Sequence, residues 1–405
     1  MNKKRVLLTG ATGLLGVNWM ALRSEVYYLV GVVRNNKFFP PGFKSVNLNC
    51  EKLEDIESYL KSENIDMVVH AAGFTSVDEC ERNPQRAHED NVLLSERIAL
   101  ACKKTGKKLV YVSTDHIFGG NGSFFREEDP TEIVNVYART KFEAEKVVAA
   151  HCPDSLIVRT NFFGWGPKYR PSLNDWIVSK LSNGEYIDMY QDIFYSPLYV
   201  GNLIETIEKL LIKEASGVFH VVGGERVSKY EFAMKLADEM GLNKGLIRPV
   251  HYNPKKSNVR RPKDMSLSTE KLDKVLGVPS AGVSENITAL LKAREKGLDK
   301  TVRSAVAPAP QITIPYGRHA LDEDDIAAVV DVLRTKWLTQ GTIVEEFEKS
   351  VADYVGSRYA VAISSWTAGL HIAAAAAHVG PGDNVITTPM SFVATSNCAI
   401  YMGAN

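Results

Sequence analysis

The stretch RVLLTGATGLLG, residues 5–16, decides how the first part of the chain folds. It begins with a short apolar run typical of a strand, and Gly10, Gly13 and Gly16 follow where a helical pattern starts. Glycine lets the backbone turn tightly and approach a pyrophosphate, while the amino end of a helix attracts negative charge. The stretch predicts a dinucleotide site; the alternative is an ordinary glycine-rich turn.

Similar apolar runs alternate with helical patterns as far as residue 160. Further strands are expected at 27–33, 67–72, 108–113 and 155–160, and helices at 91–106 and 137–151. Runs that are apolar almost throughout are typical of strands buried on both faces. We therefore predict an α/β fold, a Rossmann-type doubly wound parallel sheet.

The rest of the chain divides by composition. The alternation loosens after about residue 160, so we expect a dinucleotide-binding core over 1–160 and a smaller substrate-binding part over 161–296, together one domain of residues 1–300. The stretch KTVRSAVAPAPQ, residues 300–311, holds small residues and two prolines, which predicts a linker over 301–311. A further segment, 312–405, follows it.

Bulk composition excludes several classes of function. The 405 residues carry 48 Lys+Arg and 48 Asp+Glu, so no net charge attracts nucleic acid or a membrane surface. The five cysteines form no C-x-x-C pair, which argues against a disulfide framework and a metal site. With no signal peptide and no apolar stretch of about 18 residues, we expect a cytoplasmic protein.

A second motif, NVYARTK, places Tyr137 and Lys141 four residues apart on one face of a helix. A phenol has a pKa near ~10, and a neighbouring ammonium lowers it, so such a tyrosine can protonate the alkoxide that hydride transfer to a ketone leaves. Tyr252 and Lys256 have the same spacing, but Pro254 makes a continuous helix there improbable. The strand before Tyr137 ends in Thr114, whose hydroxyl can bond a substrate carbonyl.

The residue after the second expected strand is Arg34, and no acidic residue is near it. A cation there suits the 2′-phosphate of NADP, whereas the ribose 2′-hydroxyl of NAD is usually bound by a carboxylate. Arg34 favours NADP, with NAD possible; the alternative is a solvated surface arginine.

The motifs GATGLLG, AAGFTSVDECE, VSTDHIFGG, VYARTK and LIVRTNFFGW, in this order, resemble the extended short-chain dehydrogenase/reductase family over residues 1 to about 296. They are most similar to dTDP-4-dehydrorhamnose reductase-like proteins. The resemblance implies Thr114, Tyr137 and Lys141 as catalytic residues, with Lys141 also holding the nicotinamide ribose. It implies cofactor contacts by Gly10, Thr12, Gly13, Leu14, Leu15, Ala71, Ala72 and Gly73, and Asn91 supporting the active-site helix.

The resemblance also implies four residues near the substrate: Asp78, His116, Phe162 and Arg261. Arg261 would face the diphosphate; the alternative is a solvated surface arginine. His116 departs from the family pattern, because related dehydratases have Glu at this place and the reductases usually Tyr. Asn47 stands where many relatives have an Asp beside the adenine. We expect NADPH-dependent reduction of a nucleotide-linked 4-keto-6-deoxysugar in deoxysugar or surface polysaccharide biosynthesis. A nucleotide-sugar epimerase retaining NAD and a non-catalytic NADP-binding regulatory subunit remain alternatives.

The last segment resembles the amino-terminal part of DegT/DnrJ/EryC1 sugar aminotransferases, from WLTQG through TTPMSFVAT. In AISSWTAGLHIAAAAA, residues 362–377, a strand is expected to lead into a helix, and Trp366 replaces the family's glycine at the phosphate turn. The family's Schiff-base lysine and pyridinium-binding acid lie downstream of the matched part. We therefore expect a truncated α/β segment without a functional PLP site. Its apolar faces would dock on the reductase, pair in a homodimer or with another partner, or stay partly molten; a remnant without a role is the alternative.

Overall fold

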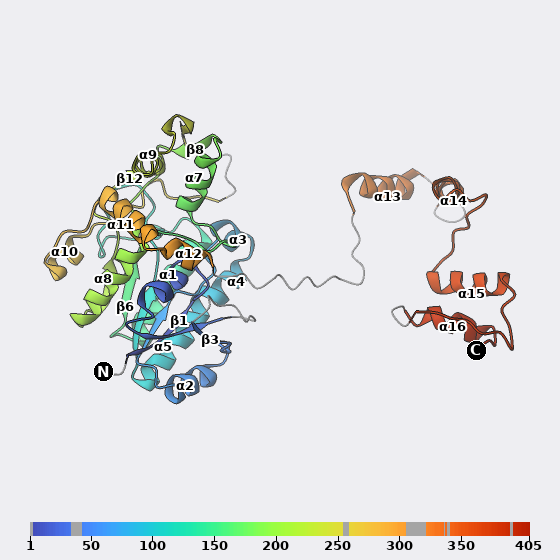
Figure 1. Ribbon diagram of the computed structural model, residues 1–405, viewed down its shortest axis with the longest axis horizontal. Helices are drawn as coiled ribbons and strands as arrows, with labels where there is room; N and C mark the ends of the chain where they lie inside the picture. The colour runs from blue at the N-terminus through green and yellow to red at the C-terminus, as the bar shows by residue number, and fades with distance from the viewer. Residues whose placement is uncertain are drawn as a thin grey trace. The chain divides into compact units, whose positions relative to one another are not determined.

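The computed structural model describes residues 3–33, 43–253, 259–304, 321–335, 337, 341–388 and 392–405. These residues form two compact units, Met1–Ile312 and Thr313–Asn405, each of which is described by itself (Figure 1). No helix in the described ranges is long and apolar enough to cross a membrane.

The first unit is built on a parallel sheet of seven strands in the order β11-β6-β5-β4-β1-β2-β3. The strands are β1 Arg5–Thr9, β2 Tyr28–Val32, β3 Lys44–Val46, β4 Met67–His70, β5 Lys108–Val112, β6 Leu156–Arg159 and β11 Gly217–His220. The five strands expected from the sequence are confirmed, as is the doubly wound parallel sheet. The edge strands β3 and β11 were not anticipated, because β3 is three residues long and largely exposed and β11 begins in a glycine.

Helices cover both faces of this sheet, which explains the unbroken apolar runs. Side chains of β1 alternate between two cores: Val6 and Leu8 pack in the cluster that includes α1 and α8, and Leu7 packs in the cluster of α2, α5 and α6. The helices are α1 Leu14–Arg23, α2 Leu53–Ser62, α5 Leu94–Thr105, α6 Val136–His151 and α8 Val200–Ile212. Smaller elements between them are α3 Val77–Arg82, α4 Pro84–His88 and the π-helical turn η1 Glu89–Leu93.

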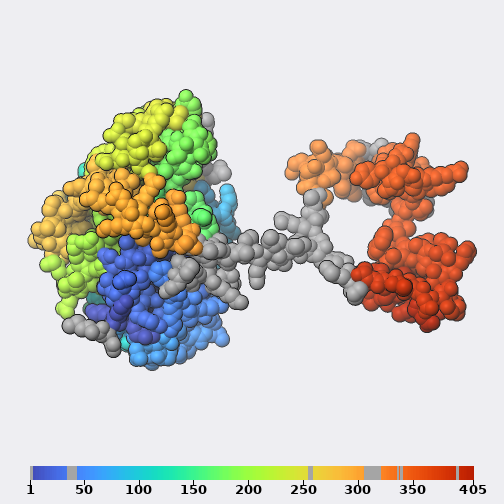
Figure 2. Space-filling view, in the orientation of Figure 1, coloured from blue at the N-terminus to red at the C-terminus, as the bar shows by residue number. Residues whose placement is uncertain are grey.

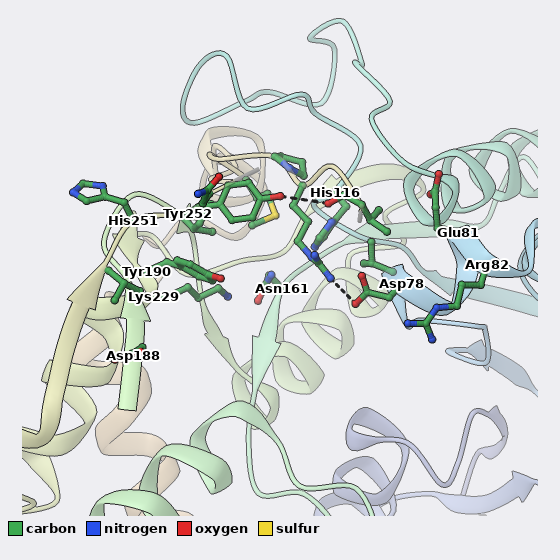
Figure 3. Close-up of a pocket in the computed structure, with 18 residues that line it drawn as sticks. Asp78, Glu81, Arg82, His116, Asn161, Asp188, Tyr190, Lys229, His251 and Tyr252 are labelled. Carbon is green, nitrogen blue, oxygen red and sulfur yellow. Dashed lines mark hydrogen bonds and ion pairs between the residues drawn. The ribbon is translucent and has the colours of Figure 1, made fainter. Parts of the chain in front are cut away.

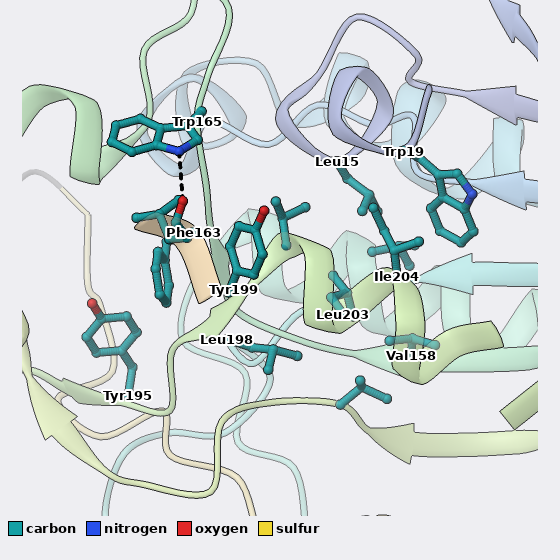
Figure 4. Packing of buried hydrophobic residues seen from close by; sticks show 14 of the residues in the cluster. Leu15, Trp19, Val158, Phe163, Trp165, Tyr195, Leu198, Tyr199, Leu203 and Ile204 are labelled. Atoms are coloured by element: carbon teal, nitrogen blue, oxygen red, sulfur yellow. Dashed lines mark hydrogen bonds between the residues drawn. The ribbon is translucent and has the colours of Figure 1, made fainter. Parts of the chain in front are cut away.

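The aromatic-rich stretch after residue 160 shares the larger of these two cores. Phe163, Trp165, Tyr195 and Tyr199 belong to the same cluster as Leu203 of α8 (Figure 4), and the Trp165 indole donates to the Leu290 carbonyl at 3.3 Å. This part holds α7 Leu173–Ser182, α9 Lys229–Glu239, α10 Glu270–Leu276, α11 Val283–Glu295 and the turn η2 Lys244–Leu246. Its strands are β7 Phe162–Phe163, β8 Ile187–Tyr190, β9 Phe194–Tyr195, β10 Leu198–Tyr199, β12 Val227–Ser228 and β13 Ile247–Val250, with β8 and β13 paired in parallel.

The chain packs against α1 again at the residues where the linker was expected to begin. Helix α12, Leu298–Arg303, packs on α1 through Val302 and Leu298, and Figure 2 shows these orange residues against the blue amino-terminal part. Residues 301–303 are therefore helical, because Val302 buries an apolar side chain; the expected linker residues 305–311 lie outside the described residues.

The described residues of the second unit contain four helices, α13 Glu323–Thr335, α14 Thr342–Val355, α15 Trp366–Ala376 and α16 Ala394–Tyr401. The expectation of a strand leading into α15 is wrong for the described residues, since residues 357–365 form no strand. A strand requires a hydrogen-bonded neighbour, and Tyr359 and Val361 are instead 73% and 78% exposed. The helix after the Ser-Ser-x-Thr turn is present as α15.

A buried ion pair fixes α6 to the sheet. Arg159 at the end of β6 donates to Glu145 of α6 through Nη2 at 2.8 Å and through Nε at 3.1 and 3.2 Å. Ser113, just after β5, donates to the same carboxylate at 2.5 Å, and both charged side chains are at most 5% exposed. The pair determines where α6, and with it Tyr137 and Lys141, lies against β5 and β6.

We predict that Glu145→Ala lowers the free energy of unfolding by about 3–5 kcal/mol, because it leaves the Arg159 guanidinium buried without its partner. The control is Glu205→Ala, which breaks the exposed pair with Lys209 and should cost less than about 0.5 kcal/mol. Denaturant unfolding followed by circular dichroism measures both values. Equal losses in the two variants would contradict the importance assigned to the buried pair.

Candidate active site

The glycine-rich turn forms one wall of a cleft at the carboxyl ends of β1, β2 and β4, with a volume of about 990 Å³. Gly10 has a φ of +71°, and a Cβ there would lie 2.7 Å from backbone atoms of Ala71 and Ala72. Only glycine fits this close approach of two strand ends. The Gly13 N–H donates to the Gly10 carbonyl at 2.9 Å, and α1 begins at the next residue. A cleft bounded by a bare turn and a helix amino end fits the pyrophosphate of a dinucleotide.

Six of the residues expected at the cofactor line this cleft: Gly10, Thr12, Gly13, Ala71, Ala72 and Gly73. Leu14 and Leu15 are not among the described residues that line it. They are the first residues of α1, and the Leu15 side chain is 3% exposed in the core. Arg34 lies outside the described residues.

Asn91 links the loop after β4, which borders the cleft, to α6. Its side chain donates to the Phe74 carbonyl at 3.1 Å and to the Thr140 hydroxyl at 2.9 Å, and accepts from the Phe74 N–H at 2.7 Å. The loop after β4 and the helix of Tyr137 are thereby held together.

Other lining residues come from distant parts of the sequence. Asn47 and its neighbours through Glu51 follow β3, while Tyr169 and Arg170 arrive from the substrate-binding part. The Tyr169 hydroxyl donates to the Thr12 carbonyl at 2.8 Å. Asn47 was noted from the family pattern, but no local pattern identified residues 169–170, because their place depends on tertiary packing.

Thr114, Tyr137 and His116 meet beyond the end of β5. The Thr114 hydroxyl lies beside the Tyr137 side chain and acts to lower the pKa of its phenol, and both residues are at most 9% exposed. The His116 ring lies edge-on to Tyr137, with ring centroids 5.6 Å apart. Asp115 is buried beneath them and accepts from the Asn161 amide at 2.6 Å.

Lys141 lies one helical turn after Tyr137 but bonds elsewhere. Its ammonium donates to the Val112 carbonyl at 2.8 Å and lies 4.3 Å from the centre of the Tyr111 ring. Burial lowers the pKa of Lys141 to about 7. Burial raises the pKa of Tyr137 to about 12, although the Thr114 hydroxyl beside it acts to lower that pKa. The expectation that the Lys141 ammonium lowers the phenol pKa is wrong for this structure, because burial and the nearby Asp115 both raise that pKa while Lys141 bonds to the Val112 carbonyl.

A second cavity, of about 1200 Å³, lies beside this group and is lined by three of the four expected substrate residues, Asp78, His116 and Arg261 (Figure 3). The Arg261 guanidinium donates to the Asp78 carboxylate at 2.7 Å, although 183 residues separate them. Phe162 is not among the described lining residues; it pairs in β7 and packs against the core, and Asn161 lines the cavity instead.

The sequence did not identify the opposite wall of this cavity. It consists of Asp188 and Tyr190 on β8, Lys229 at the start of α9, and His251 and Tyr252 after β13. Tyr252, the tyrosine of the rejected second motif, donates to the Val259 carbonyl at 3.3 Å. Within the described residues, no group of three or more His, Cys, Asp or Glu side chains is placed to hold a metal ion.

Known proteins resemble the first unit in sequence. The probable low-salt glycan biosynthesis reductase Agl14 of Haloferax volcanii is 28% identical over 70% of this chain and 96% of its own length. Spore coat polysaccharide biosynthesis protein SpsK of Bacillus subtilis is 28% identical over 60% and 82%. Methionine adenosyltransferase 2 subunit beta of Mus musculus is 28% identical over 75% and 91%.

Solved structures agree with these relatives. The dTDP-4-dehydrorhamnose reductase of Bacillus anthracis, in complex with NADP, matches with a TM-score of 0.63 and 25% identity over 72% of this chain and 99% of that one. The Yersinia enterocolitica reductase matches with a TM-score of 0.62 and 27% identity over 71% and 100%.

Two family descriptions match the chain in succession. Residues 319–405 match the DegT/DnrJ/EryC1/StrS aminotransferase family, in agreement with the resemblance of the tail. The RmlD substrate binding domain matches residues 4–295. With the parallel sheet, the cofactor cleft and the cavity beside Tyr137 in place, the first unit belongs to the RmlD substrate binding domain family.

Proposed function

We propose that the protein reduces a nucleotide-linked 4-keto-6-deoxysugar with NADPH, in the synthesis of a deoxysugar or surface polysaccharide. The observation that carries the proposal is that Thr114 and Tyr137 are buried together beyond the end of β5, against His116, which lines the polar cavity. The relatives named for reductase activity and for glycan or polysaccharide synthesis support the same class of reaction.

The cofactor residues would act through their backbone. Gly10, Thr12 and Gly13 and the amino end of α1 would hold the pyrophosphate, and Ala71, Ala72 and Gly73 would border the rest of the cofactor. A bound NADPH supplies the hydride. Lys141, freed from the Val112 carbonyl, would reach the nicotinamide ribose from α6.

The proton chemistry would belong to Thr114 and Tyr137. Their hydroxyls would bond the keto oxygen, and the Tyr137 hydroxyl would donate its proton to the oxygen as negative charge develops there. The pKa of about 12 keeps Tyr137 protonated before the reaction, as a proton donor requires. Asp78, His116 and Arg261 would contact the sugar and the diphosphate, with Arg261 exchanging its Asp78 partner for phosphate oxygens.

A second candidate is a non-catalytic subunit that binds NADP. It is favoured by the similarity to methionine adenosyltransferase 2 subunit beta, a protein named as part of another enzyme. The two candidates differ in NADPH turnover, which only the reductase would show. An epimerase would consume no NADPH and would copurify with NAD.

We propose that the second unit does not transaminate by itself. Ser365 at the turn accepts a hydrogen bond from the Ala368 N–H at 3.2 Å and so caps its own helix α15, and the next residue is the indole-bearing Trp366, 73% exposed. A phosphate cradle needs free N–H groups and close backbone approach, which the family's glycine would permit. The described residues of this turn therefore do not fit PLP phosphate.

We predict that Tyr137→Phe lowers kcat for NADPH oxidation by about 10²–10⁴-fold, because the proton donor is lost. The assay is loss of NADPH absorbance with dTDP- and UDP-linked 4-ketohexoses. NADPH affinity, measured by fluorescence, should change little. Tyr186→Phe, at a 62% exposed site outside both cavities, is the control. Unchanged turnover in Tyr137→Phe would refute the assigned role.

A second prediction concerns the choice of cofactor. Arg34→Ala should weaken binding of NADPH about tenfold or more, because a charge-assisted bond to the 2′-phosphate is lost. Binding of NADH, which lacks that phosphate, is the internal control and should change less than about twofold. Equal effects on the two cofactors, measured by fluorescence titration, would contradict the preference for NADP.

A further inference from the structure

Lys229 is a cation in the sugar cavity to which the proposed reaction assigns no role. It is the first residue of α9, directly after the capping Ser228, and lines the cavity together with His116 and Asn161. Its ammonium nitrogen lies 3.2 Å from the centre of the Tyr195 ring. In the view of Figure 3, Asn161 lies between Lys229 and Asp78.

This ammonium is held in an unfavourable place. It is at the amino end of a helix, where the helix dipole disfavours positive charge. Burial lowers the pKa of Lys229 to about 8, although the carboxylate of Asp115 raises it. Lys229 is partly buried, and its ammonium makes no hydrogen bond to any described residue, whereas enclosed polar groups in proteins usually have one. The residue lines the cavity, where a ligand can supply the acceptor.

The surroundings indicate which part of a ligand this acceptor belongs to. Asp115 directly follows Thr114, whose hydroxyl donates to its carboxylate at 3.3 Å, so the Lys229 and Asp115 charges lie near the reaction centre. Arg261, by contrast, is bound to Asp78 on α3. The carboxylate beside Lys229 would repel a phosphate. A sugar hydroxyl is uncharged, accepts from an ammonium and keeps its own proton to donate.

We propose that Lys229 donates a hydrogen bond to the 3-hydroxyl of the hexose and thereby selects sugars that carry a hydroxyl beside the carbonyl carbon. This rests on the proposed function, which identifies the ligand as a nucleotide-linked 4-ketohexose. In that ring the carbon neighbours of the carbonyl are C3, which bears a hydroxyl, and C5, which bears the methyl group and the ring oxygen. With the keto oxygen on Thr114 and Tyr137, the 3-hydroxyl is the neighbouring group that can both accept from Lys229 and donate to the Asp115 carboxylate.

The test is binding, which does not depend on turnover. Dissociation constants for dTDP-glucose, dTDP-3-deoxyglucose, dTDP-2-deoxyglucose and dTDP are measured by calorimetry with NADP present. The corresponding four UDP compounds are measured in the same way. The variants are then compared in the nucleotide series that the wild type binds more tightly. Lys229→Met should weaken binding of the glucose and 2-deoxyglucose compounds about 10- to 100-fold, the effect of losing a charged hydrogen bond. Binding of the 3-deoxy compound and of the free nucleotide should change less than about threefold.

Lys235→Met is the matched control, because Lys235 is on the same helix but pairs with Glu225 at 2.8 Å outside the cavity. If Lys229→Met does not fold, as judged by its melting temperature, Lys229→Gln replaces it with the same expected pattern. An equal loss for all four ligands, a loss that disappears with the 2-deoxy compound, or a wild type that binds dTDP- or UDP-glucose no better than the free nucleotide would overturn the inference. The expected pattern without NADPH turnover would refute the reductase proposal and leave the role of Lys229 standing.

Discussion

The buried pair of Arg159 and Glu145 is the interaction on which the arrangement of the site depends. It joins the end of β6 to α6, and Ser113 adds a hydrogen bond from the end of β5. Helix α6 carries Tyr137, Lys141 and Glu145 at intervals of four residues, and so on one face. Fixing Glu145 therefore fixes the position and rotation of the helix that carries Lys141 and Tyr137. Removing a charged pair from water costs free energy, and the attraction between the charges offsets that cost only if the pair has good hydrogen-bond geometry.

The second constraint is the parallel sheet itself. Because all seven strands run in one direction, the ends of β1, β4 and β5 meet at a single edge. The glycine turn after β1, the bare backbone after β4 and Thr114 after β5 therefore lie beside one another. The glycine-lined cleft and the hydroxyl of Thr114 therefore occur at the same edge of one sheet.

The cavity lined by Asp78, His116 and Arg261 is built differently. Its walls come from α3, β8, α9 and the stretches after β13, and its described lining includes three cations, Arg82, Lys229 and Arg261, each near a carboxylate. Arg261 has a hydrogen-bonded partner in Asp78, while Lys229, among the described residues, has the charge of the buried Asp115 and the face of Tyr195. Arg261 and Lys229 therefore differ in what a ligand can offer them: an exchange of partners at Arg261, a first hydrogen bond at Lys229.

Sequence periodicity predicted five of the seven strands, two of the flanking helices, the glycine turn and the grouping of Thr114 with Tyr137, because strand periodicity and the residues at strand ends are local properties. It misjudged the effect of Lys141 on Tyr137, since how deeply a phenol is buried depends on packing, and it did not anticipate that Asn161 rather than Phe162 is among the residues lining the second cavity. It missed Lys229, Tyr190 and Tyr169 for the same reason. Only the tertiary structure decided which residues close the two cavities, because contacts between segments far apart in the chain leave no local pattern.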